Sequence, residues 1–485
     1  MKICLEYRNL EHDLNELIMT IEMAWVKMEG QLDSLRVLWD TIQPPLQSLY
    51  YKALSHLQTK IMTAYESVRF VHEKKQLASN LPRKAKVVYF KQRLKRIVSD
   101  LEEWQRRFDP SWYLITRIAD PVVDKRLKEA ILSRDPSAVR LSHMRQVIRE
   151  ISNRRITCPV FRSPNIIGDK RSPIPRSSAY VASYRISSRQ IILDPTNFKG
   201  QTTVAAGRHP TCDLAYLLRH VEPMTFGLLK CEGVLEQAAD QATQFQFIFE
   251  IPDGLSSPVT LRSLLIENPG CSLSQRIQIA KQLARSVMFV HTTGFVHKSI
   301  RPETIIVFHK TGVERLGPSF LIGFERVRKA DGRTDLFGDL EWEKNLYRHP
   351  QRQGIHPEEV FEMRHDIYSL GVCLLEIAIW CSFVQESDSS LIPWSDLHIS
   401  QVITDKDKRR GAFEIKRKLI HLSKDRLPSL VGDRYTEVVI ACLCCLDDTE
   451  YNSFRYEQGM EDEDGVIVGV RYIENILLKL EELFI

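Results

Sequence analysis

The sequence is poor in cysteine and has no long uninterrupted apolar run. Ten cysteines in 485 residues are too few for the disulfide framework of small secreted domains. The first fourteen residues, MKICLEYRNLEHDL, carry charges throughout and lack the apolar region of a secretory signal. The apolar runs at 369–381 and 438–446 are shorter than the roughly 20 residues that cross a bilayer. These absences favour a cytoplasmic protein with reduced thiols.

Metal-binding and nucleic-acid-binding signals are equally sparse. Cys442 and Cys445 form a C-x-x-C pair, but no second pair or histidine cluster follows. Because a zinc site takes four ligands, we expect small buried thiols in the stretch VVIACLCCL and no metal site. The 67 Lys and Arg residues against 62 Asp and Glu leave a net charge of only +5. That balance does not indicate a nucleic-acid partner.

The length and the ordinary globular composition predict two or three domains. Residues 1–152 contain only one glycine, and their apolar residues recur at spacings of three and four, which predicts an all-α helical bundle. We expect Pro44-Pro45 to end the first long helix and Asp109-Pro110 to close the third near residue 107. Residues 153–178 are rich in Pro, Ser, Arg and Asn and predict a linker.

The pattern changes at about residue 179. Short β-like runs (AYVASYRI, QIILD, FGLLKCEGVL and FQFIFEIP) occupy residues 179–252. Long helical patterns follow over residues 253–485. Strands followed by helices favour an α+β domain with two lobes, a small lobe at about 179–252 and a large lobe at about 253–485. The predicted fold class is therefore multidomain, with an N-terminal helical bundle and a C-terminal α+β bilobal domain.

The segment 295–307 reads FVHKSIRPETIIV and follows an amphipathic helix expected at 273–293. It resembles the catalytic loop of protein kinases, HRDLKPENIL, with His297, Pro302 and Glu303 matching outright.

Three further landmarks follow in the order of that family. The stretch LIGFE, centred on Gly323, stands where DFG belongs, and YRHP, ending at Pro350, stands where APE belongs. The stretch DIYSLGVCLLE, starting at Asp366, resembles the central helix of the large lobe. The resemblance covers roughly residues 180–485 and implies a protein-kinase-like fold.

Several chemical groups that this family needs are missing. Phosphoryl transfer takes an Asp base, an Asn and an Asp for Mg²⁺, a lysine on the third strand and a glycine-rich loop. Ser299, Thr304 and Gly323 stand at the base, Asn and DFG-aspartate positions, and none supplies a carboxylate. No glycine lies between Gly168 and Gly200, so the phosphate-covering loop is absent. We expect a pseudokinase that takes no cofactor.

The remaining positions of the kinase pattern either hold the loop in place or could substitute weakly for the missing catalytic groups. We expect His297 and Asp366 to hold the loop, and Arg301 to be solvated or salt-bridged. Pro195 stands near the expected lysine position, which leaves Lys199 as the candidate for nucleotide binding. An atypical active Ser/Thr kinase that binds ATP through Lys199, Asp194 or Glu325 stays open as the alternative.

The bundle carries a second resemblance. The stretches MEGQLDSLRVLWDTI, ALSHLQTKIMTAYESV and DLEEWQRRFDPSWYLITRI are similar to fungal HeLo-type, prion-inhibition-and-propagation domains. That resemblance implies signalling in nonself recognition or programmed cell death. Lytic members place an apolar helix before the bundle, whereas this chain opens with a charged stretch. We therefore expect either a truncated start or a member that does not perforate membranes.

Residues 83–96 hold seven basic and no acidic residues, interleaved with apolar ones. Such a segment is typical of a helix on an anionic membrane surface or against a partner, and equally of a bundle helix with a solvated face. The basic residues are Arg83, Lys84, Lys86, Lys91, Arg93, Lys95 and Arg96.

The leading hypothesis is a non-catalytic signalling protein in which a pseudokinase controls a HeLo-like effector domain. We expect a protein partner or self-association, no nucleic acid, and a cytoplasmic or peripheral membrane location. A pure scaffold is the third hypothesis.

Overall fold

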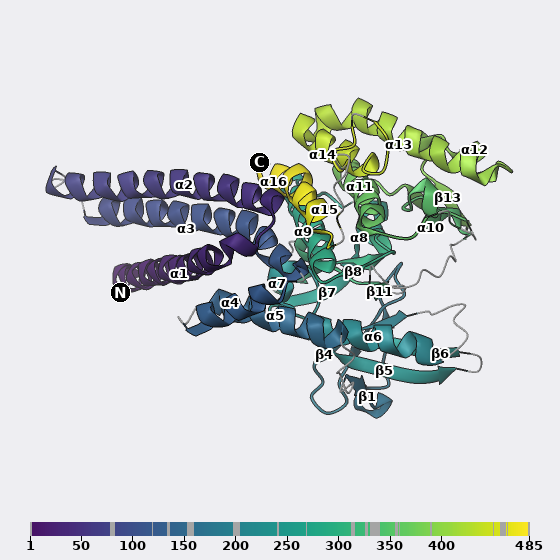
Figure 1. Ribbon diagram of the computed structural model, residues 1–485, viewed down its shortest axis with the longest axis horizontal. Helices are drawn as coiled ribbons and strands as arrows, with labels where there is room; N and C mark the ends of the chain where they lie inside the picture. Colours follow the sequence, from purple (N-terminus) through teal and green to yellow (C-terminus); the bar gives the residue numbers. More distant parts are fainter. Residues whose placement is uncertain are drawn as a thin grey trace. The chain divides into compact units, whose positions relative to one another are not determined.

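The computed structural model describes most of the chain (Figure 1). The described residues are 2–77, 83–118, 120–132, 136–152, 160–196, 204–239, 242–267, 269–311, 316–324, 328–329, 340–354, 357, 359–388, 390–449, 451–455, 462 and 464–483. The chain divides into two compact units, Met1–Gln146 and Val147–Ile485.

The first unit is built from helices joined by short turns. Its elements are α1 (Lys2–Leu38), η1 (Trp39–Thr41), α2 (Pro44–Leu77), α3 (Arg83–Leu114), η3 (Ile115–Arg117), α4 (Pro121–Leu132) and α5 (Pro136–Ser152), the last crossing into the second unit. Within this unit α3 packs on α1 and α2 (Figure 1). Pro44 begins α2, so the predicted break is confirmed, because proline is tolerated in a first helical turn.

The core of the first unit is a column of aromatic rings on one face of α3. Trp104, Phe108 and Trp112 recur every four residues and are at most 1% exposed. Their ring centroids lie 4.7 Å and 6.3 Å apart in stacked arrangements. The hydroxyl of Tyr50 on α2 donates to the Ser111 carbonyl oxygen at 2.8 Å. The FDPSWYL stretch is therefore a packing element of this unit.

The predicted end of α3 at Asp109-Pro110 is wrong, because the helix runs through Pro110 to Leu114. A proline inside a helix removes one backbone hydrogen bond and costs about 3 kcal/mol. Two features offset this cost. Asp109 accepts hydrogen bonds from Lys27 at 2.8 Å and Gln31 at 3.0 Å on α1, and Trp112 beyond the proline is buried.

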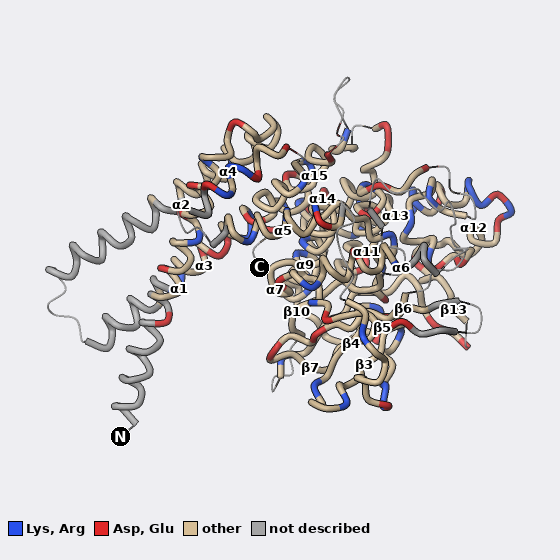
Figure 2. Tube along the Cα trace, turned by 60° about the horizontal axis from the view of Figure 1, so that its bottom comes forward, with Lys and Arg blue, Asp and Glu red and all other residues tan. Residues whose placement is uncertain are grey.

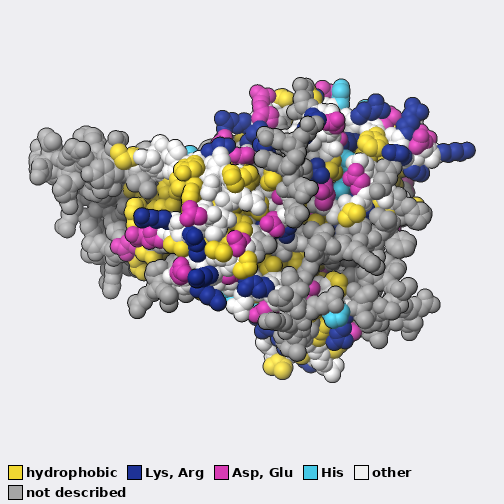
Figure 3. Space-filling view, in the orientation of Figure 1, with side chains coloured by type: hydrophobic (Ala, Val, Ile, Leu, Met, Phe, Trp, Pro, Cys, Tyr) yellow, Lys and Arg dark blue, Asp and Glu magenta, His cyan; other side chains and the backbone are white. Residues whose placement is uncertain are grey.

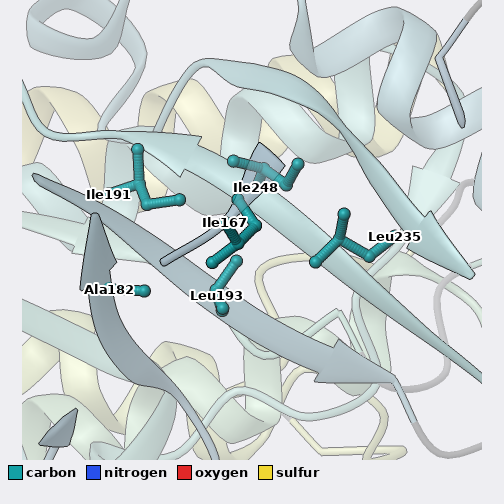
Figure 4. Packing of buried hydrophobic residues seen from close by; sticks show 6 residues of the cluster. All are labelled: Ile167, Ala182, Ile191, Leu193, Leu235 and Ile248. Atoms are coloured by element: carbon teal, nitrogen blue, oxygen red, sulfur yellow. The ribbon is translucent and has the colours of Figure 1, made fainter. Parts of the chain in front are cut away.

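The second unit contains a six-stranded sheet in the order β1-β5-β6-β4-β3-β2. Its strands are β1 (Phe161–Arg162), β2 (Ser172–Pro173), β3 (Tyr180–Ser183), β4 (Gln190–Thr196), β5 (Cys231–Ala239) and β6 (Ala242–Glu250), with α6 (Val204–Leu218) between β4 and β5 in sequence. One face of the sheet carries a packed apolar cluster (Figure 4). The cluster consists of Ile167, Ala182, Ile191, Leu193, Leu235 and Ile248.

The structure corrects the predicted linker at 153–178. β1 pairs in parallel with β5, and β2 pairs antiparallel with β3. Residues 161–173 therefore contribute both edges of the sheet, and residues 153–159 lie outside the described ranges. Pro, Ser and Arg suit edge strands and turns as well as linkers, since edge strands need fewer backbone donors. Composition alone could not distinguish a linker from edge strands and turns.

The rest of the second unit is mainly helical. Its longer helices are α8 (Leu261–Glu267), α9 (Leu273–Thr292), α11 (Met363–Ile379), α13 (Lys408–Val431), α14 (Asp433–Leu443) and α15 (Val466–Tyr472). Its shorter helical turns are α7 (Pro223–Phe226), η5 (Pro302–Thr304), α10 (Trp342–Asn345), η6 (Pro350–Arg352), η7 (Ser395–Leu397), α12 (Ser400–Thr404), η8 (Ile473–Leu477) and α16 (Leu478–Glu481). Its strands are β7 (Leu255–Thr260), β8 (Phe295–Val296), β9 (Ile305–Lys310), β10 (Leu316–Leu321), β11 (Arg328–Lys329), β12 (Val384–Ser387) and β13 (Ser390–Pro393).

The helix expected at 273–293 is confirmed as α9, which starts with a capping box between Ser272 and Gln275. α13 was not anticipated by the sequence analysis, because its charged residues obscure its apolar face. Cys442 and Cys445 are fully buried at the end of α14. Among the residues that the structure describes, no helix combines the length and apolar character needed to cross a membrane.

Candidate functional site

The segment that resembles a kinase catalytic loop lies between β8 and η5, where it is held by Asp366 on α11. The Asp366 carboxylate accepts hydrogen bonds from the backbone N–H of His297 at 2.7 Å and of Lys298 at 2.9 Å. Lys298 has a φ of +68°, a left-handed conformation that these two bonds help to hold. Burial raises the pKa of Asp366 to about 7.

His297 is fully buried and makes hydrogen bonds through both ring nitrogens. Nδ1 lies 3.3 Å from the Ser299 N–H, and Nε2 lies 3.0 Å from the Ile322 carbonyl oxygen. These contacts suit a neutral imidazole with the proton on Nε2. Burial also lowers the pKa of His297 to about 3. The ring has no free nitrogen with which to accept a substrate proton.

Thr304, at the Asn position, turns its hydroxyl back into the loop. Its Oγ1 donates towards the carbonyl oxygens of Ser299 at 2.8 Å and Arg301 at 2.9 Å, and accepts from the Arg301 N–H at 3.2 Å. Ser299, at the base position, is 4% exposed, and its Oγ has no hydrogen-bond partner among the described residues. Arg301 is buried and lies 3.8 Å from the Glu303 carboxylate.

Gly323, at the DFG-aspartate position, has no room for a side chain. Its φ is +81°, and a Cβ placed there would lie 2.2 Å from Thr304 Cγ2. The Gly323 N–H donates to Asp194 Oδ2 at 2.8 Å. Thr304 therefore closes the position that would present a metal-binding carboxylate, and Asp194 holds the backbone of that position.

Asp194 lies on β4, one residue before Pro195 and close to the position that the family resemblance gives to a lysine. The carboxylate is fully buried on the opposite face of β4 from Ile191 and Leu193. An acidic residue therefore stands near the place where the family has the lysine that binds nucleotide phosphates. Asp194, which the sequence offered only as a displaced catalytic group, is thus a structural partner of Gly323.

The ring of Phe324, the residue after Gly323, packs near the rings of His297 and of two phenylalanines on the sheet. Its ring centroid lies 4.9 Å from that of His297 and 6.2 Å from those of Phe247 and Phe249 on β6. The four rings link the sheet to the loop segment with apolar contacts.

A buried polar network, which the sequence analysis missed, supports the other end of the loop. Arg262 on α8 donates to Glu303 at 3.0 Å and to the Tyr347 hydroxyl at 2.9 Å. That hydroxyl donates to Glu376 on α11 at 2.9 Å. The sequence signal was an arginine beside the leucines of the short helix LRSLLIE.

These residues do not fit Mg²⁺–ATP, which a kinase-like fold implies. Mg²⁺ beside a nucleotide is held by one or two carboxylates together with the phosphates, and Ser299, Thr304 and Gly323 supply no carboxylate at the positions where the family resemblance places them. Lys199 and Glu325 lie outside the described residues. We derive no catalytic step through the nucleotide.

The structure describes only part of the basic segment at 83–96. Its backbone forms the start of α3, and Lys95 and Arg96 are exposed. The side chains of Arg83, Lys84, Lys86, Lys91 and Arg93 lie outside the described set.

A second basic cluster, which the sequence analysis missed, lies at the start of α13 (Figures 2 and 3). Its exposed members are Lys406, Lys408, Arg409 and Arg410. The sequence signal was the short run DKDKRR.

Comparisons with known proteins find relatives that are named as kinases or kinase-like proteins. No family model matches the chain. The chain is 27% identical over 177 residues to a Dictyostelium discoideum protein named as a probable inactive serine/threonine-protein kinase, covering 36% of this chain and 41% of that protein. It is 30% identical over 128 residues to a serine/threonine-protein kinase-like protein of Arabidopsis thaliana, covering 25% and 33%.

A third relative is named as a probable serine/threonine-protein kinase of Clostridium acetobutylicum, with 29% identity over 120 residues, covering 24% of this chain and 17% of that protein. The chain spans less than half the length of each of these relatives. Together the relatives support a region in this chain that is similar to serine/threonine kinase-like proteins, one of them named as inactive.

Proposed function

We propose that the kinase-like region is a non-catalytic regulatory module, a pseudokinase that takes no nucleotide cofactor. The observation that carries this proposal is the contact of Asp194 with the Gly323 N–H, together with the closure of the Gly323 position by Thr304. A magnesium-binding carboxylate at position 323 would clash with Thr304, and the neighbouring Asp194 carboxylate is already used by the backbone at that position. The loop is thus built for packing, since its polar groups largely bond to one another.

The second candidate is an atypical kinase, in which Asp194 would serve as a displaced base or metal ligand. The same contact disfavours it, because one carboxylate oxygen of Asp194 is occupied by a backbone N–H. Incubation with Mg²⁺, [γ-³²P]ATP and generic protein substrates tests this candidate. We expect no incorporation beyond that of an Asp194→Asn variant, and incorporation lost in that variant would favour the kinase.

For the helical unit we propose an effector role that the kinase-like region controls. The similarity of its sequence to HeLo-type domains supports nonself-recognition or cell-death signalling as the output, with self-association or a protein partner as the next step. The basic segment at 83–96 supports peripheral contact with an anionic membrane, because each basic residue near such a surface contributes about 1 kcal/mol. We propose no nucleic-acid partner.

Vesicle co-sedimentation of the full chain tests the membrane output. The vesicles contain phosphatidylcholine alone or with 30% phosphatidylserine, which separates anionic attraction from general adsorption. Changing the seven basic residues of 83–96 to Gln should abolish binding to the anionic vesicles. The matched control changes Lys406, Lys408, Arg409 and Arg410 to Gln. The membrane role would be contradicted if both variants lost binding equally or if the unmodified chain did not bind. The hypothesis of a pure scaffold would then remain.

A further inference from the structure

The turn at residues 174–179, between β2 and β3, is anchored to elements far along the chain. The carbonyl oxygen of Pro175 accepts hydrogen bonds from Thr260 Oγ1 at 3.0 Å and Ser263 Oγ at 3.2 Å. Both hydroxyl residues are at most 2% exposed, and their oxygens lie 2.9 Å apart, so either hydroxyl can donate to the other in place of its bond to Pro175. The two hydroxyl groups are buried, whereas Pro175 is exposed, so this half of the contact is only partly shielded from water.

The other half of the contact is ionic and faces water. Arg176 donates to both carboxylate oxygens of Glu386 on β12, at 2.8 Å and 3.1 Å, and to Glu267 on α8 at 3.1 Å. The Arg176 side chain is 25% exposed, whereas those of Glu267 and Glu386 are 61% and 48% exposed. The hydrogen bond to Arg176 lowers the pKa of Glu386. Bidentate geometry strengthens such a pair, while exposure makes it sensitive to salt.

α8 also contacts the loop segment described above, and the same arginine of α8 reaches the start of β12. Arg262, next to Ser263 on α8, donates to Glu303 at 3.0 Å and to Ser382 Oγ, just before β12, at 2.5 Å. Arg262 is 2% exposed. The same short helix therefore contacts the sheet's first hairpin through Ser263 and Glu267, and the loop segment through Arg262.

We propose that the 174–179 turn is a latch that holds the edge of the sheet against α8 and β12, and that its release loosens the loop segment at 299–304 through α8. The latch does not depend on the proposed function, because it concerns the opening of contacts and not the fate of a nucleotide. Each exposed ion pair contributes little, so loss of the Arg176 pairs should change the population of the released form only by a small factor. A weak contact of this kind suits a switch. A partner that binds the released form only modestly better than the latched form would still shift the chain towards the released form.

Hydrogen exchange followed by mass spectrometry on the full chain tests the latch. The probe variant is Arg176→Ala. The matched control is Arg185→Ala in the turn after β3, where an exposed arginine pairs with Asp169 at 2.7 Å within the sheet region. We expect Arg176→Ala to speed exchange about three- to tenfold in peptides covering 172–183, 261–267 and 299–306. Arg185→Ala should leave the last two unchanged.

Two further measurements keep the test decisive if Arg176→Ala folds poorly. Raising NaCl from 0.05 to 0.5 M should speed exchange of the unmodified chain in the same three peptides. The charge exchange Arg176→Glu with Glu386→Arg should restore slow exchange relative to Arg176→Glu alone. Three results would overturn the latch. Exchange could become faster only in 172–183, the two arginine variants could have equal effects, or exchange could be independent of salt.

Discussion

Replacing Gly323 by alanine should lower the free energy of unfolding of the second unit by more than the cost of the positive φ alone. A non-glycine residue at a φ of +81° costs about 1–2 kcal/mol. The new Cβ would also lie 2.2 Å from Thr304 Cγ2 and 2.7 Å from Thr304 Cβ. Overpacking of this kind costs about 1–3 kcal/mol. We therefore expect a total loss of about 2–5 kcal/mol in the free energy of unfolding.

Gly254 provides the matched control, because its φ is +76° and nothing lies within 4 Å of a Cβ built there. Gly254→Ala should cost only the conformational part, about 1–2 kcal/mol. Adding Thr304→Ser to Gly323→Ala removes Cγ2 and should recover part of the steric loss, since the hydroxyl bonds are kept. The assay is urea denaturation followed by tryptophan fluorescence. Equal losses at Gly323 and Gly254 would refute the closed DFG position.

Three other expectations can be checked on the same preparation. Asp194→Ala leaves the buried Gly323 N–H without its acceptor and should cost about 1–3 kcal/mol in urea denaturation; Asp194→Asn, which keeps an acceptor, should cost less. His297 has a folded pKa of about 3, below its ordinary value of about 6.5, so the unfolded chain binds the proton first and stability falls as pH drops from about 6.5 towards 3. His297→Gln should make that fall shallower by up to about 1.4 kcal/mol per pH unit, and parallel pH profiles would contradict the neutral buried ring. Phe108→Ala opens the aromatic column of the first unit and should cost about 3–5 kcal/mol, with loss of helical circular dichroism on mild heating.

The long elements could be predicted from the sequence because their signals are local. The apolar spacing of α9 and its Ser272 cap lie within one stretch of chain, as do the strands β3 to β6. The end of α3 was mispredicted because Pro110 is a local breaker, whereas the contacts of Asp109 and Trp112 that sustain the helix come from distant residues. Residues 161–173 of the predicted linker join the sheet for a similar reason, since their pairing partners β3 and β5 follow later in the chain.

The loop positions His297, Ser299, Thr304, Gly323 and Asp366 could be proposed from the sequence, because their order and spacing resemble a known pattern. Their contacts could not be found in the same way. The bond from Gly323 to Asp194 spans 129 residues, and the pair of Arg176 with Glu386 spans 210. Contacts at such separations leave no periodicity or spacing in the sequence, so only the folded chain brings them together.

The most direct test of the central claim is a thermal-shift titration of the full chain with ATP, with and without Mg²⁺. A ligand that binds the native state at one hundred times its Kd stabilises that state by about 2.7 kcal/mol. The closed position at Gly323 and the buried Asp194 carboxylate predict no Mg²⁺-dependent rise in the unfolding midpoint at millimolar ATP. A midpoint that rises with ATP only when Mg²⁺ is present would contradict the account, because it would require a nucleotide and metal site at these residues.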